Sequence, residues 1–186
     1  MTARIPRLRF EQLPAPIADG LRAKVERLGY LGEFFAATAH QPEALKAFMD
    51  FTDLAKGELD MRLVELLALT VATMKHVAYE KNQHERLAVK LGYSRDWVMA
   101  VEALNPDAQT LFNDDERAVQ RYVIAAVERD GVDVGSLLQA VVERLGVAGA
   151  VAVMFVMGRY TTHAIIVNSL DIKAPVPSIF DDGFTA

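Results

Sequence analysis

Apolar residues recur at helical spacing along almost the whole chain. Ile17, Leu21, Val25 and Leu28 follow one another at intervals of three or four residues, which is the period of one helix face. Similar patterns cover residues 41–58, 94–104, 113–130 and 133–146. No segment has the alternating pattern of a strand hairpin. We therefore predict an all-α protein, a bundle of about eight helices with short connections.

Two segments stand out from this pattern. Residues 59–91 read as helix without an internal proline or glycine, and Gly92 then offers a C-terminal stop. Residues 147–157 form the most apolar run of a last helix that follows Gly146 and ends near Leu170. That run is too short for a bilayer, which takes about 20 apolar residues. We predict a buried core helix, or one packed between subunits.

Aromatic and methionine side chains near these helices are assigned to the core rather than to a cofactor site. They include Trp97, Met154 and Phe155, residue types that most often fill interiors. The tail, residues 174–186, contains two prolines and two aspartates. It should lie extended on a surface, either its own or that of a partner subunit.

Length, charge and cysteine content narrow the class of protein. The chain has 186 residues, enough for one domain covering 1–186, and the joint at 105–112 is the sole candidate boundary. A net charge of -5 argues against non-specific nucleic-acid binding, while leaving room for a local basic patch. The first residues show no secretory signal, so we expect a cytoplasmic protein without membrane association. The absence of cysteine removes thiolate chemistry and disulfides.

The segment VAYEKNQH, residues 77–84, carries the most suggestive chemistry. Glu80 and His84 are four residues apart and so share a helix face, which His76 extends. A carboxylate that orients an imidazole suits general acid–base catalysis. The alternative is an exposed pair worth a few tenths of a kcal/mol, and spacing alone favours it. His76 and His84 would stand about 12 Å apart along one helix, so we predict no metal site there.

Residues 61–94, MRLVELLALTVATMKHVAYEKNQHERLAVKLGYS, resemble the core of the carboxymuconolactone decarboxylase-like superfamily, which includes alkyl hydroperoxidase D. Redox members have a glutamate, twelve residues to a Cys-x-x-Cys pair, and a histidine four residues further on. This chain has Glu65, Val77, Glu80 and His84 at those positions. Residues 39–51 and 167–180 also resemble the family, so the likeness extends from about Leu28 onward.

The resemblance implies a pocket that the helical pattern alone does not give. In one straight helix Glu65 would lie about 22 Å from Glu80. The family fold breaks the helix near Lys75 and brings Glu65, Tyr79, Glu80 and His84 together. Members of the family are commonly homotrimers or homohexamers. A dithiol peroxidase needs two thiols, so the absence of cysteine excludes that activity.

These features lead us to expect a cofactor-free lyase, a decarboxylase of a small carboxylated or lactone compound, with residues 59–92 as its core motif. His84 would be the acid–base residue, Glu80 its orienting partner and Glu65 a second acid–base or relay group. Tyr79 and His76 would contact the substrate. Two alternatives remain open: a non-catalytic binding or assembly protein, and a lactone hydrolase. A polar pocket around the glutamate–histidine pair would favour an enzyme.

Arg159 and His163 form a second polar pair, four residues apart in the last helix. As substrate-binding residues, they would supply a cationic anchor for a carboxylate. As structural residues, they would satisfy each other's hydrogen bonds at a subunit contact. The residue pattern favours the structural role.

Overall fold

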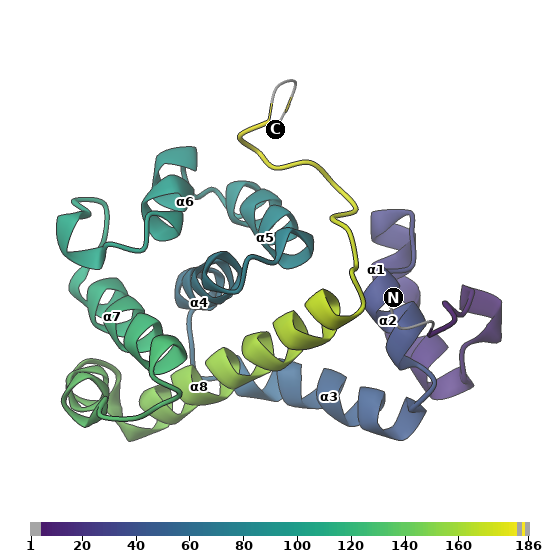
Figure 1. Ribbon diagram of the computed structural model, residues 1–186, viewed down its shortest axis with the longest axis horizontal. Coiled ribbons are helices and arrows are strands. Elements are labelled where there is room, and N and C mark those ends of the chain that lie inside the picture. The colour runs from purple at the N-terminus through teal and green to yellow at the C-terminus, as the bar shows by residue number, and fades with distance from the viewer. Residues whose placement is uncertain (1–4, 182–183, 185–186) are drawn as a thin grey trace.

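The computed structural model describes residues 5–181 and 184, and every regular element in them is helical (Figure 1). The α-helices are α1 (Ala15–Leu28), α2 (Glu33–Thr38), α3 (Pro42–Ala55), α4 (Met61–Met74), α5 (Ala78–Lys90), α6 (Arg95–Glu102), α7 (Asp114–Glu128) and α8 (Gly135–Ser169). Short 3-10 helices cover Phe10–Gln12 and Pro106–Ala108. The all-α prediction is confirmed.

Helix α4 lies at the centre of the bundle, with α5, α7 and α8 packed against it (Figure 1). Most of its side chains are buried, because the sequence from Leu63 to Ala72 is apolar apart from Glu65 and Thr70. A larger apolar core surrounds α4, α6 and α7, and a smaller one joins α1 to α3 with the end of α8. The candidate site lies where these two cores meet.

The predicted helix starts are confirmed by their caps. The Ser94 hydroxyl accepts a hydrogen bond from the Trp97 amide. Asn113 and Glu116 form a reciprocal capping box at the start of α7. These short polar side chains satisfy amides that have no partner inside the helix.

The chain breaks between α4 and α5, as the family resemblance implies. Helix α4 ends at Met74, α5 begins at Ala78, and His76 between them has a φ of 54°. Val77 is 2% exposed, and the Asn168 side chain donates to the Lys75 carbonyl over 2.9 Å. The break turns α5 back against α4, so that side chains nineteen positions apart meet.

The two helices that the sequence pattern places on either side of Gly146 form one kinked helix, α8, with the kink at that glycine. Its φ of 72° and ψ of 174° belong to a region that only glycine adopts readily. By length and composition alone α8 would suffice to cross a membrane. In its most apolar 18-residue stretch, 33% of the residues are buried. A core helix passes the same test, and α8 packs against both α4 and α7.

One expectation about packing needs correction. Trp97 is buried as predicted, but Met154 and Phe155 are 40% and 51% exposed, so their assignment to the core of this chain is wrong. The described part of the tail, residues 174–181, lies along α5 of this chain, one of the two placements expected. There the Asn82 side chain donates to the Val176 carbonyl over 2.9 Å, and the Ile179 amide donates to Glu85 over 2.8 Å.

Candidate active site

His84 is held from behind by Glu65. The helix break places Glu65 of α4 beside α5, and its Oε2 lies 2.7 Å from Nδ1 of His84. Tyr160 packs edge-on against the imidazole, with ring centroids 5.3 Å apart. The two contacts fix the ring orientation and leave Nε2 as the nitrogen nearer the pocket.

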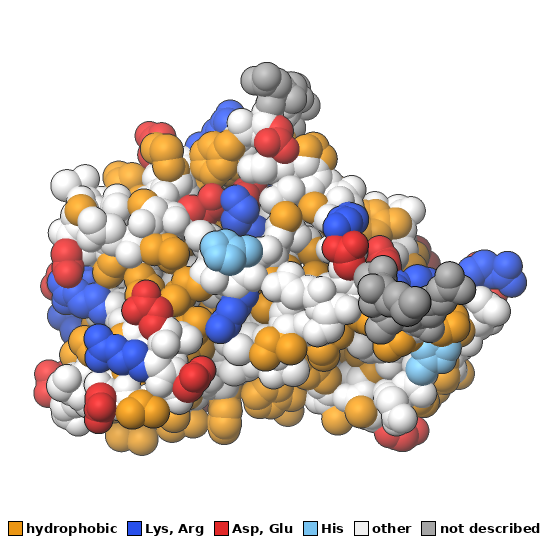
Figure 2. Space-filling view, in the orientation of Figure 1, with side chains coloured by type: hydrophobic (Ala, Val, Ile, Leu, Met, Phe, Trp, Pro, Cys, Tyr) orange, Lys and Arg blue, Asp and Glu red, His pale blue; other side chains and the backbone are white. Residues whose placement is uncertain are grey.

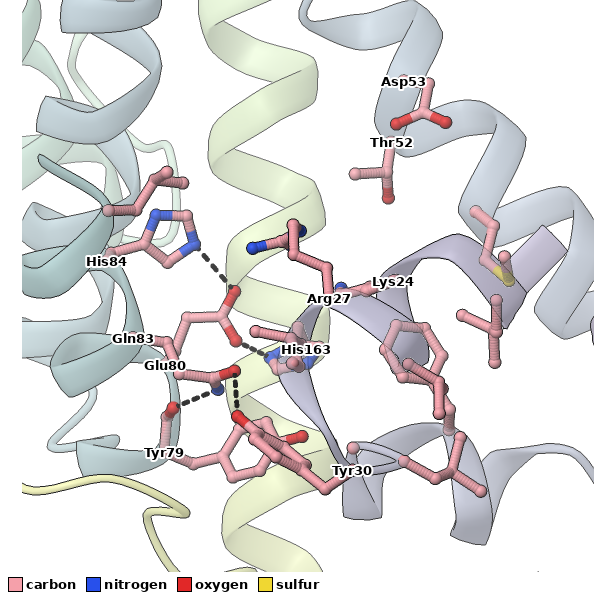
Figure 3. A pocket seen from close by; sticks show the side chains of 18 of the residues that line it. Lys24, Arg27, Tyr30, Thr52, Asp53, Tyr79, Glu80, Gln83, His84 and His163 are labelled. Atoms are coloured by element: carbon pink, nitrogen blue, oxygen red, sulfur yellow. Dashed lines mark hydrogen bonds and ion pairs between the residues drawn. The ribbon is translucent and has the colours of Figure 1, made fainter. Parts of the chain in front are cut away.

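Glu80 is the centre of a second set of contacts, in the first turn of α5, where the helix dipole favours a carboxylate. Arg159 donates to its Oε1 over 3.0 Å. Nδ1 of His163 approaches its Oε2 to 2.8 Å, and Nε2 of His84 lies 3.3 Å from its Oε1 (Figure 3). Both imidazole contacts are close but lack the alignment of a good hydrogen bond.

These charges separate the protonation states of the two histidines. Burial alone would lower the pKa of His84, but Glu65 and Glu80 outweigh it and raise that pKa to about 9. Burial lowers the pKa of His163, against the influence of Glu80. Burial would raise the pKa of Glu80, but His163 and Arg159 hold it well below its ordinary value. At neutral pH the site therefore contains a protonated His84, a neutral His163 and an ionised Glu80.

A pocket of about 500 Å³ opens beside this network, between α1, α3, α5 and α8 (Figure 3). Its volume suits a small-molecule ligand. The Tyr79 hydroxyl reaches Gly32, where an added Cβ would lie only 2.8 Å from it, so a glycine is needed at that wall. Lys56 and Tyr160 also line the cavity.

Most of the predicted site residues come together here. Tyr79, Glu80, His84, Arg159 and His163 all line the pocket. Arg159 and His163 both meet Glu80 inside this chain, and the structural role at a subunit contact stays a prediction.

Two other predictions need revision. Glu65 is 1% exposed and stands behind His84, so it is Glu65 rather than Glu80 that orients the imidazole through Nδ1. His76 as a substrate contact is wrong. It is exposed at the helix break and borders a different depression with Asn168 and Asp171.

Lys24, Lys56 and Tyr160 were missed. Each faces the pocket from a helix or a helix end, and in the sequence each is an ordinary residue of an amphipathic pattern. Lysines on such helices usually face water, so no sequence signal separates these from the others. Their position depends on how α1 and α3 pack against α8.

Similarity to known proteins agrees with this fold. Residues 42–132 match the carboxymuconolactone decarboxylase family. A cysteine-to-alanine variant of the debrominase Bmp8, in complex with 2,3,4-tribromopyrrole, has a TM-score of 0.77 at 16% identity, covering 93% of this chain and 92% of its own. Among curated proteins, no relative matches this sequence.

Two further structures have the same fold. An uncharacterised peroxidase-related protein with an alkylhydroperoxidase AhpD core, from Ralstonia eutropha JMP134, has a TM-score of 0.74 at 17% identity, covering 92% of this chain and 90% of its own. A protein of unknown function from Agrobacterium tumefaciens, a candidate antioxidant defence protein AhpD, has a TM-score of 0.66 at 20% identity, covering 74% and 94%.

The fold and the pocket define an all-α protein of the AhpD-like type. More specifically, residues 42–132 match the carboxymuconolactone decarboxylase family, the resemblance that the sequence motif indicates, and the chain contains no cysteine.

Proposed function

We propose that the protein is a cofactor-free carboxy-lyase acting on a small carboxylated or lactone compound. One observation carries the proposal. His84 is protonated at neutral pH, is oriented by a buried carboxylate on Nδ1, and has Nε2 at a pocket of ligand size. A proton donor held in this way is what a decarboxylase needs at the carbon that loses carbon dioxide.

The proposed reaction breaks the bond between the substrate carbon and its carboxylate. The electron pair moves into a conjugated carbonyl of the substrate, carbon dioxide leaves, and the proton on Nε2 of His84 is transferred to the carbon. His84 then regains a proton from solvent. The Tyr160 hydroxyl is buried and has no hydrogen-bond partner among the described residues, so it is available to donate to the carbonyl oxygen that gains charge.

The remaining polar groups would hold the substrate and the charges in place. Lys56 lines the pocket and makes no ion pair within residues 5–181, which suits it to anchor the substrate carboxylate. The charge of Arg159 keeps Glu80 ionised, and the adjacent protonated His84 adds to this effect. The ionised Glu80 in turn keeps His84 protonated until the transfer.

The open polar pocket supports an enzyme over a binding module that has lost its site. A lactone hydrolase could use the same histidine and carboxylates on a water molecule. Product analysis separates the two reactions, because only decarboxylation releases carbon dioxide. The lyase is preferred because a histidine that is already protonated is ready to act as an acid rather than as a base toward water.

The test is a panel of β-keto acids and carboxylated unsaturated lactones, assayed for carbon dioxide release. Once a substrate is found, His84→Asn should lower turnover by roughly a hundredfold or more. His76→Asn is the matched control, because His76 is exposed outside the pocket and should leave turnover unchanged. Full turnover by the His84 variant would overturn the assignment.

A further inference from the structure

The mouth of the pocket carries a group of cations that the proposed reaction does not use. We call Lys24 and Arg27 of α1, with Arg86 and Lys90 of α5, the mouth cations. All four line the pocket, and Figure 3 shows Lys24 and Arg27 on the α1 side, facing Glu80 and His84 across the opening. Lys24, Arg27 and Lys90 are exposed, as expected of residues at the entrance.

Within the part of the chain that the structure describes, none of the mouth cations forms an ion pair with a carboxylate. The lysines that do so are elsewhere, at positions such as Lys46 and Lys81. Arg86 donates one hydrogen bond to the Pro177 carbonyl over 2.9 Å, which leaves its positive charge uncompensated. Four unpaired cations around one opening repel one another unless an anion lies between them.

Tyr30 lines the same pocket as the mouth cations. Burial raises the pKa of Tyr30, and Arg27 and Arg86 both act in the opposite direction. One phenol therefore senses a guanidinium from α1 and another from α5. Burial lowers the pKa of Lys24, Glu80 acts in the opposite direction, and Arg159, Lys56 and Arg27 lower the pKa further. Lys24 therefore lies near several cations as well as the Glu80 carboxylate.

The pocket contrasts with the chain as a whole. The protein has a net charge of -5, yet the pocket lining contains just two carboxylates, Asp53 and Glu80. Glu80 is already bound to Arg159 and His163. The positive charge is thus concentrated at this opening against the overall charge of the molecule, which raises the local concentration of anionic ligands.

The number of mouth cations favours a phosphate group over a carboxylate as the anion bound there. A carboxylate has one charge and two oxygens, which a single arginine fork can satisfy. A phosphate group carries a charge of about −1.5 to −2 and three acceptor oxygens, and so can engage three or four cations together. Lys56, which also lines the pocket, remains for the carboxylate at the reacting end.

We propose that the mouth cations form a phosphate subsite, and that the substrate carries a phosphate ester or anhydride at the end remote from His84. The assignment of a reacting end rests on the proposed lyase function, whereas the subsite itself does not. It commits the substrate to a phosphorylated small molecule rather than a plain dicarboxylate.

The test is calorimetric binding of pyrophosphate, inorganic phosphate and glutarate to the full-length protein. Pyrophosphate should bind at least about tenfold more tightly than glutarate, because more of its oxygens meet cations. Lys24→Gln combined with Arg27→Gln should weaken pyrophosphate binding by about tenfold or more. The matched control, Lys46→Gln with Lys173→Gln, removes the same charge outside the pocket and should change the affinity less than about threefold.

The binding measurements test the phosphate assignment and the position of the subsite separately. Equal affinity for glutarate and pyrophosphate would overturn the phosphate assignment, and unchanged affinity in the Lys24 and Arg27 double variant would overturn the subsite. Both substitutions are at exposed positions, and circular dichroism checks that the variant is folded. His84→Asn should keep pyrophosphate binding within about threefold while abolishing decarboxylation, so failure of the lyase proposal is seen separately.

Discussion

His84 is the middle member of a row of alternating charges. Glu65 lies on one side of its ring and Glu80 on the other, and Arg159 follows Glu80. Each charge in such a row is stabilised by its neighbours, and a group left without its partner in a buried site is costly. The protonation state of the histidine is therefore set by two carboxylates from different helices.

We expect the pKa of His84 to be measurable directly. Nitrogen NMR of the imidazole should give a pKa of about 9 in the wild-type protein. Glu65→Gln should lower that pKa, because it removes the charge that lies 2.7 Å from Nδ1. Glu58→Gln, at an exposed position, is the control and should leave it unchanged. A Glu65 variant with the wild-type pKa would show that this carboxylate does not act on the ring.

The same raised pKa predicts a pH dependence of stability. The folded-state pKa of His84 is about 9, against 6.5 for the free group, so its contribution is fully present below about pH 6.5 and is lost as pH rises through about 9. We expect the free energy of unfolding to fall by up to about 3 kcal/mol across that interval. Denaturant titrations at several pH values measure this, and His84→Asn should reduce the slope.

Sequence reasoning found candidate site residues but not the cations that line the pocket. Glu65, Glu80 and His84 were found because their spacing matches a family motif. Carboxylates and an imidazole at that spacing can act together in acid–base chemistry. Lys24 and Lys56 follow no such motif, and their place in the pocket depends on helix packing. The sequence assigned the orientation of His84 to Glu80, whereas Glu65 makes the contact with Nδ1. That contact depends on the turn between α4 and α5, which residue spacing does not describe.

At the level of helices, two of the glycines of α8, Gly146 and Gly158, have opposite effects on stability. Gly146 has a φ of 72° and ψ of 174°, which strains any other residue by about 1–3 kcal/mol. Gly158 is helical, and an added Cβ there meets nothing within 4 Å.

We therefore expect Gly146→Ala to destabilise the protein by about 1–3 kcal/mol. Gly158→Ala should stabilise it by up to about 1 kcal/mol, because alanine is the better helix former. Chemical denaturation of the two variants measures both changes. Two losses of similar size would mean that the kink at Gly146 is not the cause.

The break between α4 and α5 marks the limit of the helical pattern as a guide. No proline or glycine lies between Leu59 and Leu91, so the pattern alone predicts one helix. The break is held by tertiary contacts, the burial of Val77 and the bond from Asn168 to the Lys75 carbonyl. Caps such as Ser94 and Asn113 are local and were predictable, whereas this turn needed the family resemblance.

For the whole molecule, the open question is the apolar face of α3 and α8. Figure 2 shows hydrophobic side chains gathered along the lower edge, where Figure 1 places these two helices. The exposed members of this apolar face are Phe51, Leu54, Val147, Val151, Met154, Phe155 and Ile165. The sequence pattern cannot separate burial within a chain from burial between chains, which is why Met154 and Phe155 were misassigned.

We propose that a second copy of this chain covers the apolar face, because an exposed surface of this kind marks an interaction site and one without charges is complementary to itself. The wild-type protein should then run as a homo-oligomer in light scattering coupled to size exclusion.

Phe155→Lys should weaken association by roughly a hundredfold, since a charge buried there without a partner costs about 3 kcal/mol. Leu111→Lys is the control, at a residue 48% exposed outside this face, and should leave the mass unchanged. A monomeric wild-type protein would contradict the proposal. A Phe155 variant that keeps the full assembly would also contradict the proposal. Phe155 is 51% exposed and contacts Phe51 within the apolar face, so a second copy that covers this face must meet it.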